Sequence, residues 1–192
     1  MNLKKREILF DSARIKSAVE KVAIEISCYV SSNGIRRLDV LWVAEGAVMF
    51  AADLLRALPP DLQTRVSSIR VSSYGDALSP VGEPVLQGDI RRFKDRDVLV
   101  VDDVLDTGGT MRALLEALKS AGARSVKSCV LISKRFSGKR AVEADFKCFE
   151  AGSEFVYGYG LDFKGMYRNL ADICIYRESE TEEDSNDKTA NH

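Results

Sequence analysis

Apolar and polar positions along the chain follow two periods, one typical of helices and the other typical of buried strands. Helical spacing recurs in three segments, at residues 12–26, 48–58 and 110–121. β-Branched apolar runs fall between and after them, at residues 38–43, 66–71, 98–101, 125–133 and 173–176. Strands that alternate with helices in this way predict a parallel α/β sheet with helices on both faces.

In the first helical segment the apolar positions predict one broad buried face. It is formed by Ile15, Val19, Val22, Ile24 and Ile26. The second helical segment is stopped by Pro59, and the third has Gly122 close behind its last apolar residue. The helices of the predicted fold are therefore amphipathic and bounded by residues that end helices.

Two segments do not fit the alternation. Residues 73–89 are rich in Gly, Pro and Ser, and we expect them to form a loop without secondary structure that is either functional or disordered. Residues 177–192 contain six acidic side chains against Arg177 and Lys188, and Ala190 is their one apolar residue. Such a segment buries too little apolar surface to order itself, so we predict a domain over residues 1–176 and a disordered acidic tail.

Composition agrees with a single compact domain. The chain has 192 residues, of which 45% are hydrophobic, and that length can bury a full core. Lys and Arg number 28 against 29 Asp and Glu, so the net charge of −1 argues against nucleic acid and anionic membranes as partners. No apolar run is long enough to cross a bilayer or to serve as a signal peptide. We expect a soluble, cytoplasmic protein.

Cysteine and histidine usage narrows the possible chemistry. The four cysteines are scattered without a CxxC pair, which indicates reduced thiols and no cysteine metal site. The one histidine, His192, is the last residue, which argues against histidine catalysis and histidine metal binding. Acid–base chemistry is therefore expected from carboxylates, Lys or Tyr.

The most informative segment joins a buried strand to an amphipathic helix. The apolar run 98–101 leads to Asp102 and Asp103, and a loop from Asp106 to Thr110 opens the helix. Loops at the carboxyl ends of parallel strands bind ligands, and the N–H groups of a Gly-rich loop at a helix N-terminus form a cradle for phosphate. Carboxylates beside such a cradle can accept hydrogen bonds from sugar hydroxyls, so the pattern indicates a site for a phosphorylated sugar. The structural alternative is a solvated strand end with Asp106 as a helix N-cap.

Two motifs in this chain resemble those of one enzyme family. The segment from Val100 to Thr110 resembles the phosphoribosyl-pyrophosphate (PRPP) signature of type I phosphoribosyltransferases. The segment from Glu154 to Asp162, with Tyr167 to Leu170 after it, is similar to the purine-site segment of hypoxanthine-guanine phosphoribosyltransferases. The resemblance runs from about Ile8 to Tyr176. It implies a parallel, doubly wound sheet with a small hood built from the N-terminal segment and from about 134–176.

The resemblance also implies which residues hold PRPP. Asp102 and Asp103 would bind the ribose hydroxyls, directly or through Mg²⁺, and Asp106 would manage the proton of the purine as general base. The 5′-phosphate would lie in the loop formed by Asp106, Thr107, Gly108, Gly109 and Thr110. Pyrophosphate would meet Glu45, Gly46, Ser73, Tyr74 and Arg168. Ser73, Tyr74 and the loop after them would close over the site as a lid.

A second group of residues is implied for the purine base. Lys134 would donate to O6, which separates 6-oxopurines from adenine because the 6-amino group of adenine cannot accept that bond. Phe155 would stack on the ring, the backbone of Val156 would meet the ring edge, and Asp162 would lie near the 2-position and a second metal ion. From the residues alone, an ordinary surface lysine at a strand end is the favoured interpretation of Lys134, and Phe155 and Val156 are equally consistent with core strand residues.

Three positions depart from the usual pattern of the family. Glu45 stands where members usually carry Lys, Gly109 replaces a larger residue, and Asp102 replaces the more usual Glu. A carboxylate at position 45 would repel pyrophosphate if it pointed inward. We therefore expect weakened pyrophosphate affinity.

The function implied is Mg²⁺-dependent transfer of the phosphoribosyl group from PRPP to N9 of hypoxanthine or guanine in purine salvage. The products would be IMP or GMP and pyrophosphate, and the family resemblance implies a homodimer or homotetramer. Two alternatives stay open. One is a phosphoribosyltransferase for xanthine or another base, and the other is a non-catalytic regulator that senses PRPP or a nucleotide.

Overall fold

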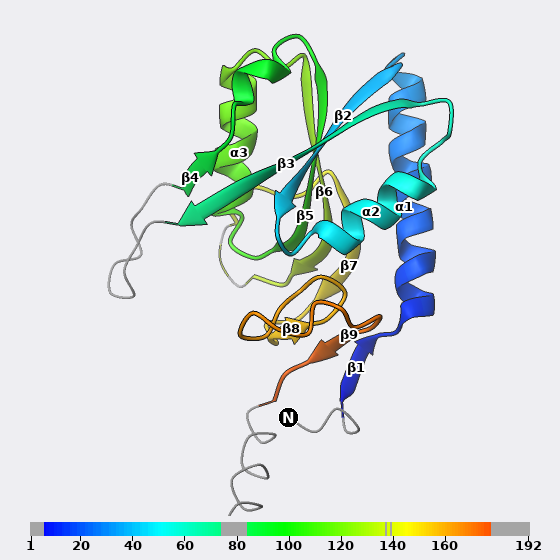
Figure 1. Ribbon diagram of the computed structural model, residues 1–192, viewed down its shortest axis with the longest axis vertical. Coiled ribbons are helices and arrows are strands. Elements are labelled where there is room, and N and C mark those ends of the chain that lie inside the picture. The colour runs from blue at the N-terminus through cyan, green and yellow to red at the C-terminus, as the bar shows by residue number, and fades with distance from the viewer. Residues whose placement is uncertain (1–5, 74–83, 137, 139, 178–192) are drawn as a thin grey trace, which may run out of the picture.

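The computed structural model describes residues 6–73, 84–136, 138 and 140–177 (Figure 1). Tyr74 and the predicted acidic tail beyond Arg177 lie outside the described residues. A six-stranded sheet in the order β4-β3-β2-β5-β6-β7 forms the centre. Its strands are β2 (Arg37–Ala44), β3 (Gln63–Ser73), β4 (Pro84–Gln87), β5 (Asp97–Leu105), β6 (Ser125–Lys134) and β7 (Phe146–Ala151). All neighbouring pairs are parallel except β3 and β4.

Helices pack on both faces of this sheet, which confirms the predicted doubly wound α/β class. The helices are α1 (Ser12–Ser32), α2 (Val48–Ala57) and α3 (Gly109–Ser120), with a short 3-10 helix η2 (Ile90–Phe93). In β2, Leu38 and Val40 join the core formed with α1 and α2, whereas Leu41 and Val43 join the core formed with α3. Because successive strand residues point to opposite faces, a strand covered on both sides is apolar throughout.

Helix α1 begins where a side chain caps it. The carboxylate of Asp11 accepts a hydrogen bond from the backbone N–H of Arg14 at 2.8 Å. Its buried face contains Ile15, Val19, Val22 and Ile26 as expected. The prediction for Ile24 is wrong, since this side chain is 64% exposed and lies off the 3.6-residue stripe.

A second, three-stranded sheet forms a hood over the carboxyl end of the central strands. It consists of β1 (Glu7–Phe10), β8 (Val156–Tyr157) and β9 (Ile173–Ile175) in the order β1-β9-β8, all antiparallel. In Figure 1 the hood lies below the central sheet, next to the arrowhead of β2. Segments about 150 residues apart in the chain thus form one small layer beside the strand ends.

Three expectations about these elements are wrong. Strand β5 continues through Asp102 and Asp103 to Leu105, because β6 stays paired with it as far as Leu105 and Ser133. Part of the segment expected to lack secondary structure is β4, which pairs with β3, so the sheet is mostly rather than wholly parallel. Within the segment assigned to the hood, β7 joins the central sheet as an edge strand. Only one of its six residues is fully buried, so its sequence lacks the apolar run of a central strand.

The described helices include none that is long and apolar enough to cross a bilayer. All four cysteines are free thiols, as expected. Burial raises the pKa of the Cys148 thiol to about 12 and that of Cys129 well above its ordinary value. Both thiols therefore stay protonated and unreactive at neutral pH.

Candidate functional site

The strand order places a topological switch point between β2 and β5. From β2 the chain passes through α2 to β3 on one side, and from β5 it passes through α3 to β6 on the other. The two connections diverge, and at such a point open α/β sheets bind ligands in a crevice outside the carboxyl ends of the strands. The short turn after β2 and the loop after β5 both border this crevice.

A pair of acids lies at the carboxyl end of β5. Asp102 is buried and Asp103 is half-buried, and the N–H of Asp103 donates to the Asp102 carboxylate at 2.9 Å. Burial, and then the charge of Asp103, raises the pKa of Asp102 well above its ordinary value. Neither carboxylate forms an ion pair with any described Lys or Arg. The pair is a concentration of negative charge that a cation or hydroxyl donors would stabilise.

Backbone packing brings the turn after β2 and the hood onto this acid pair. A Cβ atom on Gly46 would overlap the Asp103 carboxylate. Gly160, in the hood connection, has φ +98°, and a Cβ there would overlap the carbonyl oxygen of Gly46. Gly160 therefore requires glycine, whereas a larger residue at position 46 would have to displace the Asp103 carboxylate. Gly46 was among the residues expected at the site, but Gly160 was not. The two closely spaced glycines, Gly158 and Gly160, are the feature of the sequence that could have indicated a close backbone approach there.

The loop from Asp106 to Thr110 leads into α3. Gly108 is the N-cap of the helix and is left-handed, with φ 80°, a conformation that glycine adopts without steric cost. Because Gly108 has no side chain, it cannot cap α3 itself, and the N–H of Gly109 makes only a long bond of 3.5 Å to the Thr107 hydroxyl. The helix-cap interpretation of Asp106 is wrong, since Asp106 precedes the N-cap by two residues and its side chain is exposed.

A buried arginine that sequence analysis missed holds this loop in place. The Arg140 guanidinium donates to the carbonyl oxygen of Asp106 at 2.8 Å, to the Ser133 hydroxyl at 2.9 Å and to the carbonyl oxygen of Lys134. It also forms an ion pair with Glu143 at 2.8 Å, and its side chain is only 8% exposed. One side chain therefore joins the Asp106 loop to the end of β6. No period or motif marks Arg140, because it lies in an irregular connection.

Glu45 lies in a cluster of charged side chains beside the crevice. Its carboxylate is 3.0 Å from the guanidinium of Arg70, on β3, and 3.8 Å from that of Arg168. Arg168 also pairs with Asp162 at 3.1 Å and donates to the carbonyl oxygen of Gly160 at 2.7 Å. The structure therefore brings together Glu45, Arg168 and Asp162, and adds Arg70, which sequence analysis missed. The carboxylate of Glu45 is partly balanced by two arginines.

The residues expected around the base occupy the hood and the end of β6. Phe155 is 49% exposed, with ring edges against Phe163 and Tyr176 at centroid distances of 6.0 and 6.2 Å. The core-strand interpretation of Phe155 is therefore wrong. Val156 is buried in β8 and pairs with Ile175, while Lys134 is the last residue of β6 and half-buried.

The candidate metal ligands at the end of β5 are carboxylate oxygens. Among the described residues, no three His, Cys, Asp or Glu side chains lie close enough to hold a metal ion together. Asp102 and Asp103 provide a carboxylate pair of the kind that Mg²⁺ uses when substrate phosphates and water complete its shell. Asp162 is outside that pair, with its second carboxylate oxygen accepting from the N–H of Gly165 at 2.8 Å. Ser73 ends β3.

Comparisons with known proteins agree on one family. Residues 6–164 match the phosphoribosyl transferase domain. The chain is 34% identical to a hypoxanthine-guanine phosphoribosyltransferase of Aquifex aeolicus, covering 91% of this chain and 97% of that protein. It is also 34% identical to the Schistosoma mansoni enzyme of the same name, over 89% of this chain and 63% of that protein. Among solved structures, Trypanosoma cruzi hypoxanthine phosphoribosyltransferase in complex with the product IMP has a TM-score of 0.84 at 33% identity, covering 93% and 98% of the two chains.

Proposed function

The chain belongs to the phosphoribosyl transferase domain family, and from that premise we propose that it transfers the phosphoribosyl group of PRPP to N9 of a 6-oxopurine. Hypoxanthine and guanine are the substrates, and IMP or GMP and pyrophosphate are the products. The observation that carries the proposal is that an acid pair without an ion-pair partner among the described residues and a phosphate-type loop follow β5 at the switch point of the sheet. The activity belongs to purine salvage.

Binding of PRPP is assigned to the two loops that border the crevice. The loop from Asp106 to Thr110 would hold the 5′-phosphate with backbone N–H groups at the start of α3. The carboxylates of Asp102 and Asp103 would accept hydrogen bonds from the ribose hydroxyls. Gly46 would let pyrophosphate approach the backbone of the turn after β2, and Arg168 would contact it with its planar donor fork.

The base is assigned to the surface between the hood and β6. Phe155 would cover one face of the ring, while the Lys134 ammonium would donate to O6. In the reaction, the bond from ribose C1 to pyrophosphate breaks, the leaving group takes the electron pair, and purine N9 bonds to C1. Asp106 would accept the proton that the purine loses. Arg140 holds the backbone of Asp106 and Lys134 together and would set the spacing between these two groups.

The acid pair suits Mg²⁺, which would neutralise charge on the departing pyrophosphate when bound. Asp102 and Asp103 would supply its carboxylate ligands, with Asp162 serving a second ion. We further propose that the protein acts in the cytoplasm as a homodimer or homotetramer. The mass of the purified protein in solution, measured by light scattering, tests the assembly.

Formation of IMP or GMP from PRPP and Mg²⁺ tests the function, with hypoxanthine, guanine, xanthine and adenine offered separately. We expect turnover of hypoxanthine or guanine, and a fall in kcat of about 100-fold or more in Asp106→Asn, the usual range for loss of a general base. The matched control is Asp95→Asn, which removes an exposed carboxylate at the opposite end of the sheet.

Three outcomes would change the assignment. Turnover of xanthine alone would move the protein to a different substrate within the same family. Absence of turnover with measurable PRPP or nucleotide binding would identify a regulator built on this fold. Equal kcat in Asp106→Asn and the wild type would remove Asp106 from the mechanism.

A further inference from the structure

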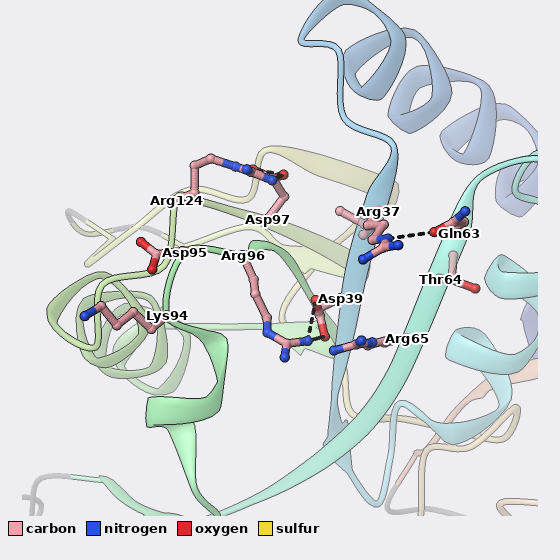
Figure 2. Close-up of a pocket in the computed structure, with 11 residues that line it drawn as sticks. Arg37, Asp39, Gln63, Thr64, Arg65, Lys94, Asp95, Arg96, Asp97 and Arg124 are labelled. Carbon is pink, nitrogen blue, oxygen red and sulfur yellow. Dashed lines mark hydrogen bonds and ion pairs between the residues drawn. The ribbon is translucent and has the colours of Figure 1, made fainter.

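A cluster of basic side chains lies at the other end of the sheet, among the amino ends of the parallel strands. A cavity of about 610 Å³ opens there between β2, β3 and β5 (Figure 2). Five Lys and Arg side chains line it against three Asp side chains, and Leu38 is its one apolar lining residue. The cavity is thus polar and carries an excess of two positive charges.

Two of the three acids are already matched within the chain. Asp39 is buried and pairs with Arg96 at 3.3 Å. Asp97 is buried, accepts from Nε of Arg124 at 3.0 Å and accepts from the Ser125 hydroxyl at 2.7 Å. Each of these ion pairs is neutral, so the excess positive charge of the cavity comes from the other side chains that line it.

The remaining cations have little to balance them. Arg37 donates to the neutral amide oxygen of Gln63 at 2.7 Å. Within the part of the chain that the structure describes, the side chains of Arg65 and Lys94 form no hydrogen bond or ion pair. In Figure 2 the Arg65 guanidinium points toward the region occupied by Asp39 and Arg96. Asp95 is the one carboxylate of the lining outside the two matched pairs.

A smaller neighbouring cavity extends the same surface. Its volume is about 290 Å³, and it shares Arg65 and Arg96 with the first cavity and adds Arg92. The two cavities together are lined by five arginines (Arg37, Arg65, Arg92, Arg96 and Arg124), and they share Asp39, so several guanidinium groups border one surface. Guanidinium groups pair with phosphoryl oxygens through two parallel hydrogen bonds. Because the lining is almost entirely polar, it would not bind an apolar ligand.

We propose that this cavity is a second anion site, which binds a polyphosphate chain at the end of the sheet opposite the phosphoribosyl crevice. The shared chemistry is a run of phosphoryl groups, carried either by an inorganic polyphosphate or by a nucleoside triphosphate. Arg65, Lys94 and Arg37 would supply the contacts, while Arg96 and Arg124 stay committed to their aspartates. The inference is independent of the proposed enzymatic function.

Calorimetric titration of the wild type with inorganic tripolyphosphate, without Mg²⁺, tests the proposal. A parallel arm uses ATP, and both arms are repeated with the protein saturated in GMP, which would occupy the opposite end. The cavity variant is Arg65→Gln with Lys94→Gln, two exposed side chains whose loss leaves both ion pairs in place. The control variant is Lys16→Gln with Lys21→Gln, which makes the same charge change on exposed positions of α1.

We expect one tripolyphosphate to bind in the presence of GMP, and affinity to fall about tenfold or more in the cavity variant but not in the control, since two charge-assisted contacts are lost. Equal affinity for ATP would show that the phosphate chain alone is recognised, and tighter ATP binding would show that a nucleoside contributes. The proposal is overturned if the GMP-saturated protein binds neither anion, or if the cavity variant binds as tightly as the wild type. Phosphoribosyl transfer by the cavity variant, assayed separately, reports on the proposed function and not on this site.

Discussion

The two ends of the central sheet both carry aspartates, but their surroundings differ. At the amino ends, Asp39 and Asp97 are buried and each is paired with an arginine. At the carboxyl end of β5, Asp102 is similarly buried, accepts a hydrogen bond from the N–H of Asp103 and forms no ion pair with a described residue. The pKa of Asp97 is lowered, chiefly by the hydrogen bond from Arg124, whereas burial and Asp103 raise the pKa of Asp102.

This difference separates charges that serve the fold from charges that await a ligand. A buried carboxylate with its own guanidinium is satisfied within the chain and has no capacity left for a substrate. A buried acid pair without a cation is destabilising until hydroxyl donors or a metal ion arrive. The same reasoning applies to the cations at the amino ends. Arg96 and Arg124 are paired with aspartates, whereas Arg65 and Lys94 form no ion pair with a described residue.

The largest effect on activity is expected when a single methyl group is added at position 46, beside the acid pair at the carboxyl end of the sheet. In Gly46→Ala, the new Cβ would displace the Asp103 carboxylate without entering the core. We expect kcat/KM for PRPP to fall about 100-fold, the usual cost of a displacement of about 1 Å in a reacting site, with the melting temperature nearly unchanged. Gly88→Ala is the control, since its Cβ would meet only Ile69 at ordinary contact distance. Wild-type kcat/KM in Gly46→Ala would contradict the assigned crevice.

The next effect belongs to the amino end and concerns stability. Asp97→Asn should lower the free energy of unfolding by about 2 kcal/mol, because the hydrogen bonds from Arg124 and Ser125 lose their charged acceptor. Its kcat should stay at the wild-type value. Chemical denaturation monitored by circular dichroism measures the first quantity and the transfer assay the second. A large loss of kcat at unchanged stability would mean that the two ends are not separate in function.

Asp97 also makes the free energy of unfolding depend on pH in the acid range. Because the folded pKa of Asp97 lies below its ordinary value of 3.8, its ionised form stabilises the fold above that pH. This contribution is lost as the pH falls through the folded pKa. The stability difference between wild type and Asp97→Asn should therefore shrink as the pH is lowered from 5 toward 2. A difference that stays constant over this range would show that Asp97 does not titrate with folding.

A smaller effect is expected when the positioning residue Arg140 is changed. Arg140→Met removes the bonds to Asp106 and Lys134, and we expect kcat/KM for the purine to fall about tenfold, with partial recovery in Arg140→Lys. The pH dependence of kcat should shift as well, since Asp106 moves relative to the base. A melting temperature that drops while kcat and its pH profile stay unchanged would reduce Arg140 to a structural role.

The smallest effect concerns Glu45. Glu45→Gln frees Arg70 and Arg168 from a carboxylate, so we expect the KM for PRPP to fall about threefold, in keeping with the modest strength of exposed ion pairs. Glu20→Gln, on the exposed face of α1, is the matched control. A higher KM in Glu45→Gln would mean that the carboxylate assists pyrophosphate binding.

Much of this protein follows from the order of its residues. Apolar runs covered on both faces predict β2, β5 and β6, and the segment from Asp102 to Thr110 predicts acids and a phosphate-type loop at a strand end, because these features are local in the chain. Edge strands such as β4 and β7 escape prediction, since β4 has only four residues and only one of the six residues of β7 is fully buried.

Folding alone decides which distant groups meet. Gly160 packs on Gly46, Arg140 joins Asp106 to Lys134, and Arg168 reaches Glu45, over separations that no local pattern encodes. The pairing of Asp97 with Arg124, and the lack of an ion-pair partner for Asp102 among the described residues, also depend on which strand ends lie side by side. A residue's identity states which charge it can carry, but only the packed neighbours determine whether that charge is already balanced or is available to a ligand.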